Sequence, residues 1–248
     1  VKKFNSIFYF LHLRLLDDWM DKKSLKKCKD KMNLSQLEES YKSSRIKGDW
    51  VDISEKAIAF ANGCQQVRKY DAAITCLSKL ALDIKDDNKL LAVVLTALGT
   101  AYWEKAQLKK ALEQFEKALV LFKEIDDKDG KAAILSIVGI TYWRKCEWDR
   151  ALEILKDALS LKPNWEERFI FLYGAFDRGV VTLKNRVRLG RELEQPMKVL
   201  QPLFSSTALH LIIGNLEEFN TCLDESMTLA QQLNQADILK AAEGIKRL

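Results

Sequence analysis

The side chains best suited to catalysis are few and scattered along this sequence. Its 248 residues include only two histidines, His12 and His210, which stand far apart in the chain. His210 lies in the apolar stretch TALHLIIG, where a histidine is more often structural than a base or a metal ligand. No HExxH, glycine-rich phosphate loop or GxSxG motif accompanies them. We therefore expect no catalytic residues and no enzyme.

The five cysteines point to neither zinc nor disulfide chemistry. They are odd in number and include no CxxC pair, whereas zinc knuckles and disulfide frameworks need paired cysteines. Neither Cys64 nor Cys146 has a local basic partner strong enough to indicate a nucleophile. The sequence thus predicts no metal and no cofactor, and it favours a reducing, cytoplasmic setting.

Basic charge is concentrated near the start of the sequence. Residues 1–48 contain twelve Lys or Arg against six Asp or Glu, and the remaining 200 residues contain 28 against 29. The densest stretch, KKSLKKCKDK at 22–31, has the charge to contact nucleic-acid phosphates or an anionic membrane surface. Because it lacks interleaved aromatics for base stacking, we favour a solvated helix or linker. A regulatory nucleic-acid or membrane-surface binder is the alternative function.

The apolar run VKKFNSIFYFLHLRLL has some features of a secretory signal. His12 and Arg14 interrupt it, and Asp17 and Asp18 follow without a small-residue cleavage site, so we expect no signal peptide. No stretch reaches the roughly 18 apolar residues of a membrane span. With three prolines, ten glycines and abundant Ala, Leu, Lys and Glu, the composition predicts an all-α fold.

The clearest pattern is an internal repeat of forty residues. LGTAYWEKAQLKKALEQFEKAL begins at Leu98, and VGITYWRKCEWDRALEILKDAL begins at Val138. The matched pairs are Leu98/Val138, Gly99/Gly139, Tyr102/Tyr142, Ala111/Ala151, Phe115/Leu155 and Ala118/Ala158. This pattern resembles the tetratricopeptide repeat, a helix-turn-helix unit that stacks into a solenoid.

The resemblance implies a right-handed α-solenoid of antiparallel helix pairs. Three repeats are expected within residues 51–165, at about 54–88, 92–128 and 132–165. A lysine-rich segment at 1–50, with helices over 4–19 and 34–46, precedes them, and degenerate repeats and capping helices fill 166–248. The units are longer than the family's 34 residues, which we attribute to longer helices.

A glycine stands at the same place in two predicted helices, Gly99 and Gly139. Glycine within a helix costs about 1 kcal/mol relative to alanine, so its recurrence needs a reason. We expect each glycine to let the second helix of its own repeat approach closely.

Two tryptophans indicate where a partner would bind. Helical spacing places Leu98 and Tyr102 on the core stripe, and it places Trp103 with small residues on another face. In the resembled family, the first helices of successive repeats line a concave groove. We therefore predict a largely apolar groove, walled by Trp103 and Trp143, that binds a peptide or helical segment of another protein. The predicted surface comprises Asn62, Gln66, Val93, Thr96, Ala97, Thr100, Trp103, Ala133, Ser136, Ile137, Ile140, Trp143 and Arg144.

The same pattern permits a second interpretation, in which the chain fills its own groove. The C-terminal helix near residues 237–248 would then lie against Trp103 and Trp143, and truncating either indole would lower stability rather than affinity. The sequence leaves both interpretations open.

One known ligand class of the resembled family is disfavoured. The basic clamp that binds acidic chaperone tails requires Lys, Asn and Arg at positions occupied here by Ile58, Asn62, Ala97, Ala133 and Ile137. Only Asn62 matches, so an apolar ligand is preferred. The prediction is a protein-protein interaction scaffold, acting as an assembly factor or complex subunit, with its partner and oligomeric state left open.

Overall fold

The computed structural model describes residues 33–161 and 169–248. Within these ranges the chain forms eleven helices and no strand, which confirms the all-α class. The helix predicted at 4–19 and the lysine stretch at 22–31 lie outside the described residues. None of the described helices is both long enough and apolar enough to cross a membrane.

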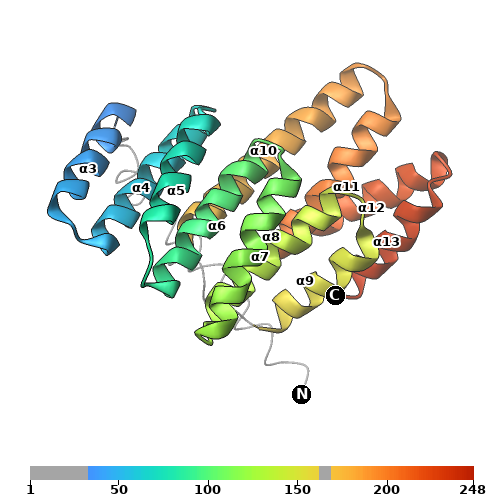
Figure 1. The fold of residues 1–248 in the computed structure, drawn as a ribbon. Helices are drawn as coiled ribbons and strands as arrows, with labels where there is room; N and C mark the ends of the chain where they lie inside the picture. Colours follow the sequence, from blue (N-terminus) through green and yellow to red (C-terminus); the bar gives the residue numbers. More distant parts are fainter. Residues whose placement is uncertain (1–32, 162–168) are drawn as a thin grey trace, which may run out of the picture.

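The helices follow one another as antiparallel neighbours along the chain (Figure 1). Their bounds are α3 Leu34–Lys47, α4 Trp50–Gln66, α5 Tyr70–Asp83, α6 Asn88–Glu104, α7 Leu108–Glu124, α8 Lys128–Arg144, α9 Trp148–Ser160, α10 Ile170–Glu192, α11 Pro196–Ile212, α12 Leu216–Gln232 and α13 Ala236–Lys246. The first helices of the three predicted repeats correspond to α4, α6 and α8, which begin at Trp50, Asn88 and Lys128 and are each 17 residues long.

Short acidic side chains start the first helix of each repeat. Asp49, Asp87 and Asp127 each accept a hydrogen bond from a backbone N–H in the first turn, at 3.0, 2.8 and 2.9 Å respectively. An Asp at this position satisfies a donor that the helix leaves unpaired. These aspartates therefore mark where each repeat begins.

The turn inside each repeat is also repeated. Ala106 and Cys146, forty residues apart, have left-handed φ angles of 63° and 61°. The following N–H groups of Gln107 and Glu147 reach back to the carbonyls of residues 102 and 142 at 2.9 and 3.1 Å. This hydrogen-bond pattern closes a helix and reverses the chain within a few residues. Each turn therefore holds two antiparallel helices together.

Close packing between paired helices explains the two glycines, as predicted. A Cβ atom at Gly99 would lie 2.5 Å from the Phe115 ring, and one at Gly139 would lie 2.7 Å from Leu155. Both distances are far below a normal carbon contact, so α6 meets α7, and α8 meets α9, only because no side chain intervenes. Phe115 and Leu155 are fully buried.

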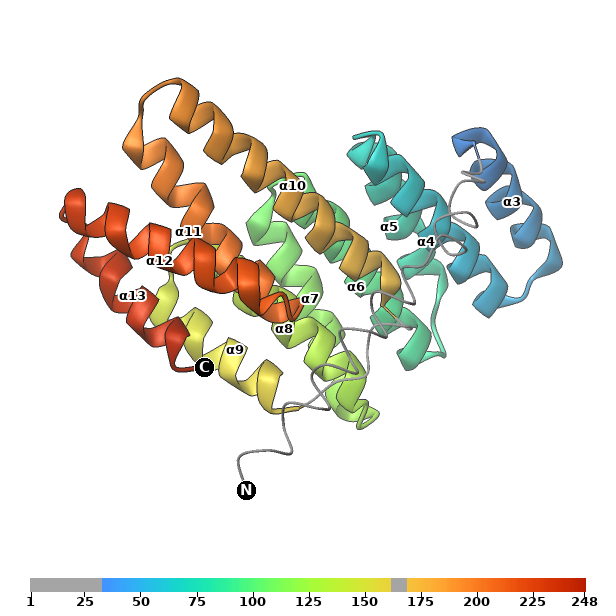
Figure 2. The same cartoon turned by 180° about the vertical axis from the view of Figure 1, so that it is seen from behind.

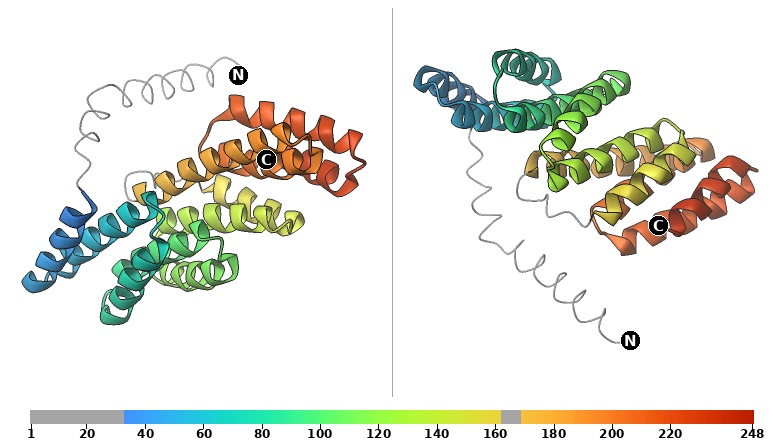
Figure 3. Two further views of the ribbon diagram at one scale, coloured as in Figure 1. Left: turned by 90° about the horizontal axis from the view of Figure 1, so that it is seen from above. Right: turned by 60° about the horizontal axis from the view of Figure 1, so that its bottom comes forward.

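The solenoid does not continue in a straight line after the third repeat. Helices α4 to α9 stack in order, but α10 packs on α6 and α4, and α11 packs on α8. A regular fourth repeat would instead place α10 beside α8 and α9. Figures 2 and 3 show α10 crossing the face formed by the first helices of the repeats. The chain therefore covers part of its own concave side.

Candidate functional site

Trp103 and Trp143 lie under the covering helices. Their side chains are only 2% and 1% exposed. Trp103 meets Phe176 of α10 edge to face, with ring centroids 6.3 Å apart. The Trp143 ring lies 4.8 Å from the Phe204 ring of α11, and its Nε1–H donates to the Phe204 carbonyl at 2.9 Å. Both indoles are thus bound by the chain's own residues.

This arrangement corrects the expectation that the two indoles wall an open groove. It favours the self-filled alternative, but the filling helices are α10 and α11 rather than the helix near 237–248. Helix α13 packs instead on α12 and α9. The physical reason is that α10 and α11 present their own aromatic side chains to an apolar face that water would otherwise contact.

Most of the smaller residues of the predicted surface are buried as well. The hydroxyls of Thr96, Thr100 and Ser136 donate to backbone carbonyls of their own helices, so they have no free proton to offer a ligand. The buried members of the predicted surface are Thr96, Ala97, Thr100, Ala133, Ser136, Ile137 and Ile140.

Asn62 and Val93 lie where the concave face remains open, at its N-terminal end. They line a cavity of about 730 Å³ between α4, α6 and the start of α10, together with Ile58, Leu90 and Phe171. We call this cavity the N-terminal pocket. Its wall also contains buried Ser54 Oγ and Asn62 Oδ1, and neither atom has a hydrogen-bond partner within the described residues.

A second opening lies between the C-terminal ends of α6 and α8 and the middle of α10. Two cavities, of about 340 and 730 Å³, meet at Arg144, Leu183 and Arg186. We call them together the interlayer cleft. Gln66, Trp103 and Arg144 line it, and so does the edge of Trp143. On this side of the molecule, the members of the predicted surface that are not covered therefore lie in the cleft.

A partly buried ion pair joins the two layers beside the cleft. Arg178 of α10 donates to both carboxylate oxygens of Glu104, at 3.0 and 2.7 Å, and Gln65 donates to the same carboxylate at 3.0 Å. The Glu104 side chain is 6% exposed. A two-point contact of this kind fixes orientation as well as distance, so it positions α10 on α6.

Arg144 and Arg186 have no carboxylate partner in the described part of the chain. The Arg144 guanidinium stacks on the Trp103 ring, 4.4 Å from its centroid. Burial, together with the smaller effect of the positive charge on Arg186, lowers the pKa of Arg144 from its ordinary value to about 10. The half-buried positive charge of Arg144, with the exposed charge of Arg186 beside it, favours an incoming anion. The cleft is therefore suited to a carboxylate or a phosphate.

The larger cavity of the cleft adds an apolar wall next to these arginines. Trp148 packs edge to face on Phe204, with centroids 5.9 Å apart, and both line the cavity with Met197 and Leu189. Met197 and Leu189 are exposed. Aromatic and flexible apolar side chains next to arginines are typical of surfaces that bind a protein segment.

The side chains contributed by α10 and α11 could not be assigned to the site from the sequence. Arg178 and Glu104 are 74 residues apart, and no motif links them. The apolar stretch around Phe176 indicated a helix but not the helices on which it packs. His210, Glu218 and Cys222, outside the cleft, form the one cluster in the described residues that could hold a metal ion.

Comparison with known proteins agrees with the repeat pattern. Residues 90–164 match the family model of the tetratricopeptide repeat. No curated protein matches the sequence. A Rap protein complexed with competence and sporulation factor has a similar structure, with a TM-score of 0.50 and 12% identity over 82% of this chain. The match covers 59% of the Rap chain.

Two further solved structures are similar at lower scores. BtubC (BKLC) from P. vanneervenii has a TM-score of 0.48 and 17% identity, over 81% of this chain and 91% of its own. Aspartyl phosphate phosphatase F from Bacillus subtilis has a TM-score of 0.47 and 12% identity, over 87% of this chain and 50% of its own. At such identities the likeness concerns the fold alone.

Proposed function

We propose that this tetratricopeptide repeat protein is a non-catalytic scaffold that binds an acidic and apolar segment of another protein in the interlayer cleft. The observation that carries the proposal is the pair Arg144 and Arg186, which line the cleft and form no ion pair with a carboxylate of the described residues. The repeats supply the rigid layer, and α10 and α11 supply the second wall.

The chemistry of the cleft defines the partner. A guanidinium binds a carboxylate through two parallel hydrogen bonds, and this pairing is strongest where water is scarce. The Asp or Glu side chain of the partner would therefore meet Arg144 and Arg186. An adjacent aromatic or aliphatic side chain would pack on Trp148 and Met197. This partner is more acidic than the purely apolar ligand expected from the sequence.

The N-terminal pocket extends the proposed binding surface. It lies at the other open end of the concave face, where Asn62 and Val93 contribute to its wall. A partner segment that continues from the cleft would place apolar side chains against Ile58 and Leu90.

The repeat pattern supports a binding role, and the cysteines support a location in the cytoplasm. Tetratricopeptide repeats are binding modules, and the similar Rap structure was solved with competence and sporulation factor bound. The four described cysteines are all free thiols, which suits the reducing cytoplasm. We infer that the protein acts there, by binding rather than by catalysis.

A displayed peptide library tests the proposal and does not require the partner to be identified first. The purified protein should select peptides in which Asp or Glu is next to an aromatic residue. Arg186→Glu should weaken binding of the selected peptides by about tenfold or more, because it replaces attraction with repulsion at the cleft. Since Arg186 is exposed, this change should leave the thermal melt almost unaltered.

Arg188→Glu is the matched control. Arg188 lies on the same helix, and it pairs with Glu192 at 2.5 Å, away from the cleft lining. Its reversal should change peptide affinity by less than about twofold. Selected peptides without acidic residues, or equal losses in both variants, would contradict the proposed site.

A further inference from the structure

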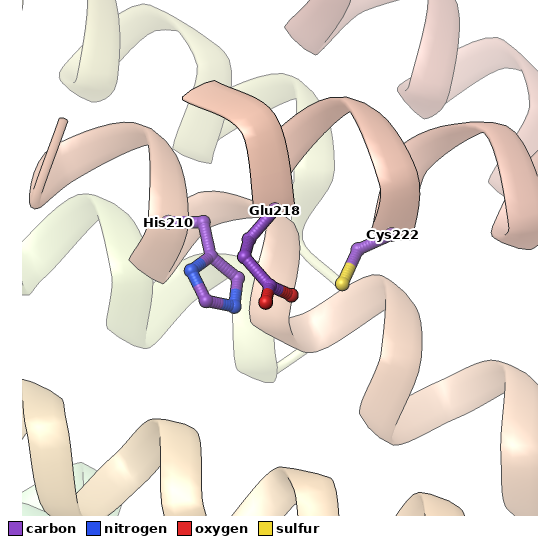
Figure 4. Close-up of side chains that lie close together, drawn as sticks. All are labelled: His210, Glu218 and Cys222. Atoms are coloured by element: carbon purple, nitrogen blue, oxygen red, sulfur yellow. The ribbon is translucent and has the colours of Figure 1, made fainter. Parts of the chain in front are cut away.

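Three potential metal ligands meet where α11 turns into α12. They are His210 near the end of α11 and Glu218 and Cys222 in the first half of α12. A ring nitrogen, a carboxylate oxygen and the sulfur all lie within 4.8 Å of one another. Figure 4 shows the imidazole and the carboxylate side by side, with the sulfur facing the same space.

His210 is the residue of the cluster whose buried polar atoms lack hydrogen-bond partners in the described part of the chain. Its side chain is 2% exposed, and neither Nδ1 nor Nε2 has a hydrogen-bond partner among the described residues. Buried ring nitrogens are almost always bonded to protein, to water or to a metal. A histidine that only filled space in the core would normally have one of its nitrogens satisfied.

The local fold holds the other two ligands in register. Glu218 and Cys222 are four residues apart on α12, so they project from the same face of the helix. The Glu218 N–H donates to the Asn215 side chain at 3.2 Å, which fixes the first turn of α12. Gly214, with a φ of 74°, makes the tight turn that brings α11 alongside. The cluster therefore depends on the hairpin, not on a flexible loop.

We propose that His210, Glu218 and Cys222 bind one divalent ion of the zinc class. Nitrogen, carboxylate oxygen and thiolate are the ligands that zinc prefers, and three protein ligands leave a fourth position for water. Tetrahedral zinc places such ligand atoms about 3.3 to 3.6 Å apart, as follows from metal-ligand distances of about 2.0 to 2.3 Å. The present separations need a closure of about 1 Å, which side-chain rotation within staggered wells supplies.

Two features of the cluster disfavour binding of a metal ion: a lysine beside Glu218 and the protonated state of the Cys222 thiol. Lys184 lies 3.3 Å from Glu218, but it is exposed, so its ammonium can move into water as the metal binds. Burial raises the pKa of the Cys222 thiol, while the neighbouring Ser206 hydroxyl lowers it. Metal binding releases the thiol proton to solvent, so affinity should rise with pH.

The competing explanation is that Cys222 is simply a core residue. It packs with Val187, Val199 and Leu203 in a small apolar cluster. That role needs no thiolate, whereas the metal site does. The proposed site would cross-link α11 and α12, and it revises the sequence-based expectation that the chain binds no metal.

Cobalt(II) substitution tests the site directly. The chelator-treated protein should bind one Co²⁺ per chain, with the absorption of tetrahedral cobalt and a thiolate charge-transfer band, and Zn²⁺ should displace it. Cys222→Ser should abolish the charge-transfer band. Cys146→Ser, which removes an exposed thiol, should leave the spectrum and the stoichiometry unchanged.

Glu218→Gln provides a second variant, because this half-buried position should tolerate the change and keep the fold. It should weaken Co²⁺ binding by about tenfold or more. Octahedral cobalt without a thiolate band in the unmodified protein would overturn the proposal. A band that persists in Cys222→Ser, or an unchanged affinity in Glu218→Gln, would do the same.

Discussion

Truncation of Trp143 is the sharpest test of how the concave face is covered. The indole is 1% exposed, packs on Phe204 and donates a 2.9 Å hydrogen bond to the Phe204 carbonyl. Replacing a buried tryptophan by alanine costs about 3 to 5 kcal/mol. In a chain of this size, 1 kcal/mol corresponds to about 2 to 4 °C in the melting midpoint. Trp143→Ala should therefore lower the midpoint by about 6 to 20 °C.

The assay is a thermal or urea melt followed by circular dichroism, with two comparison variants. Trp143→Phe keeps an aromatic ring but loses the N–H, so it should cost only about 1 to 2 kcal/mol. Trp50→Ala removes an indole that is 42% exposed, and it should cost no more than about 0.5 kcal/mol. If Trp143→Ala melts like the unmodified protein, α11 does not cover this face and the packing described here is wrong.

Three further substitutions test separate parts of the structure, each by urea unfolding. Gly139→Leu should lower the unfolding free energy by about 1 to 3 kcal/mol, because a Cβ would already stand 2.7 Å from Leu155; an unchanged value would contradict the close helix contact. Ala106→Gly should raise it by about 0.5 to 1 kcal/mol, since φ is 63° there; a destabilised variant would argue against the left-handed turn. Glu104→Ala should cost about 3 kcal/mol by leaving Arg178 unpaired between the layers, whereas a loss below about 1 kcal/mol would show that the pair does not join them.

Local and periodic features of the fold were predictable from the sequence. The forty-residue repeat predicted paired helices, and the recurring glycines predicted the close contact that Gly99 makes with Phe115. These predictions succeed because helix spacing and turn chemistry depend on residues near one another in the chain.

The covering of the groove was not predictable in the same way. Helical periodicity indicates that the face carrying Trp103 and Trp143 is apolar, but it does not say whether a partner or the chain itself lies against it. The answer depends on the direction that α10 takes after the third repeat, which brings Arg178 to Glu104 across 74 residues. No local signal encodes that direction.

The metal-ligand cluster was only partly predictable from the sequence. His210 alone resembles a structural histidine, and Cys222 alone resembles a core cysteine. The adjacent Gly214 and Asn215 are residue types that favour a turn, so a helical hairpin of α11 and α12 could have been predicted from the sequence. That step places His210 next to Glu218, and it would have revealed the cluster.

The binding of an acidic partner segment between Arg144 and Arg186 is tested most directly by a charge-swap cycle. A selected peptide and its Glu→Arg or Asp→Arg variant are each titrated against the unmodified protein and against Arg186→Glu. If the acidic side chain meets Arg186, the reversed peptide should bind Arg186→Glu better than it binds the unmodified protein, with a coupling free energy of about 1 kcal/mol or more. Additive losses, with no recovery in the doubly reversed pair, would contradict the proposed contact.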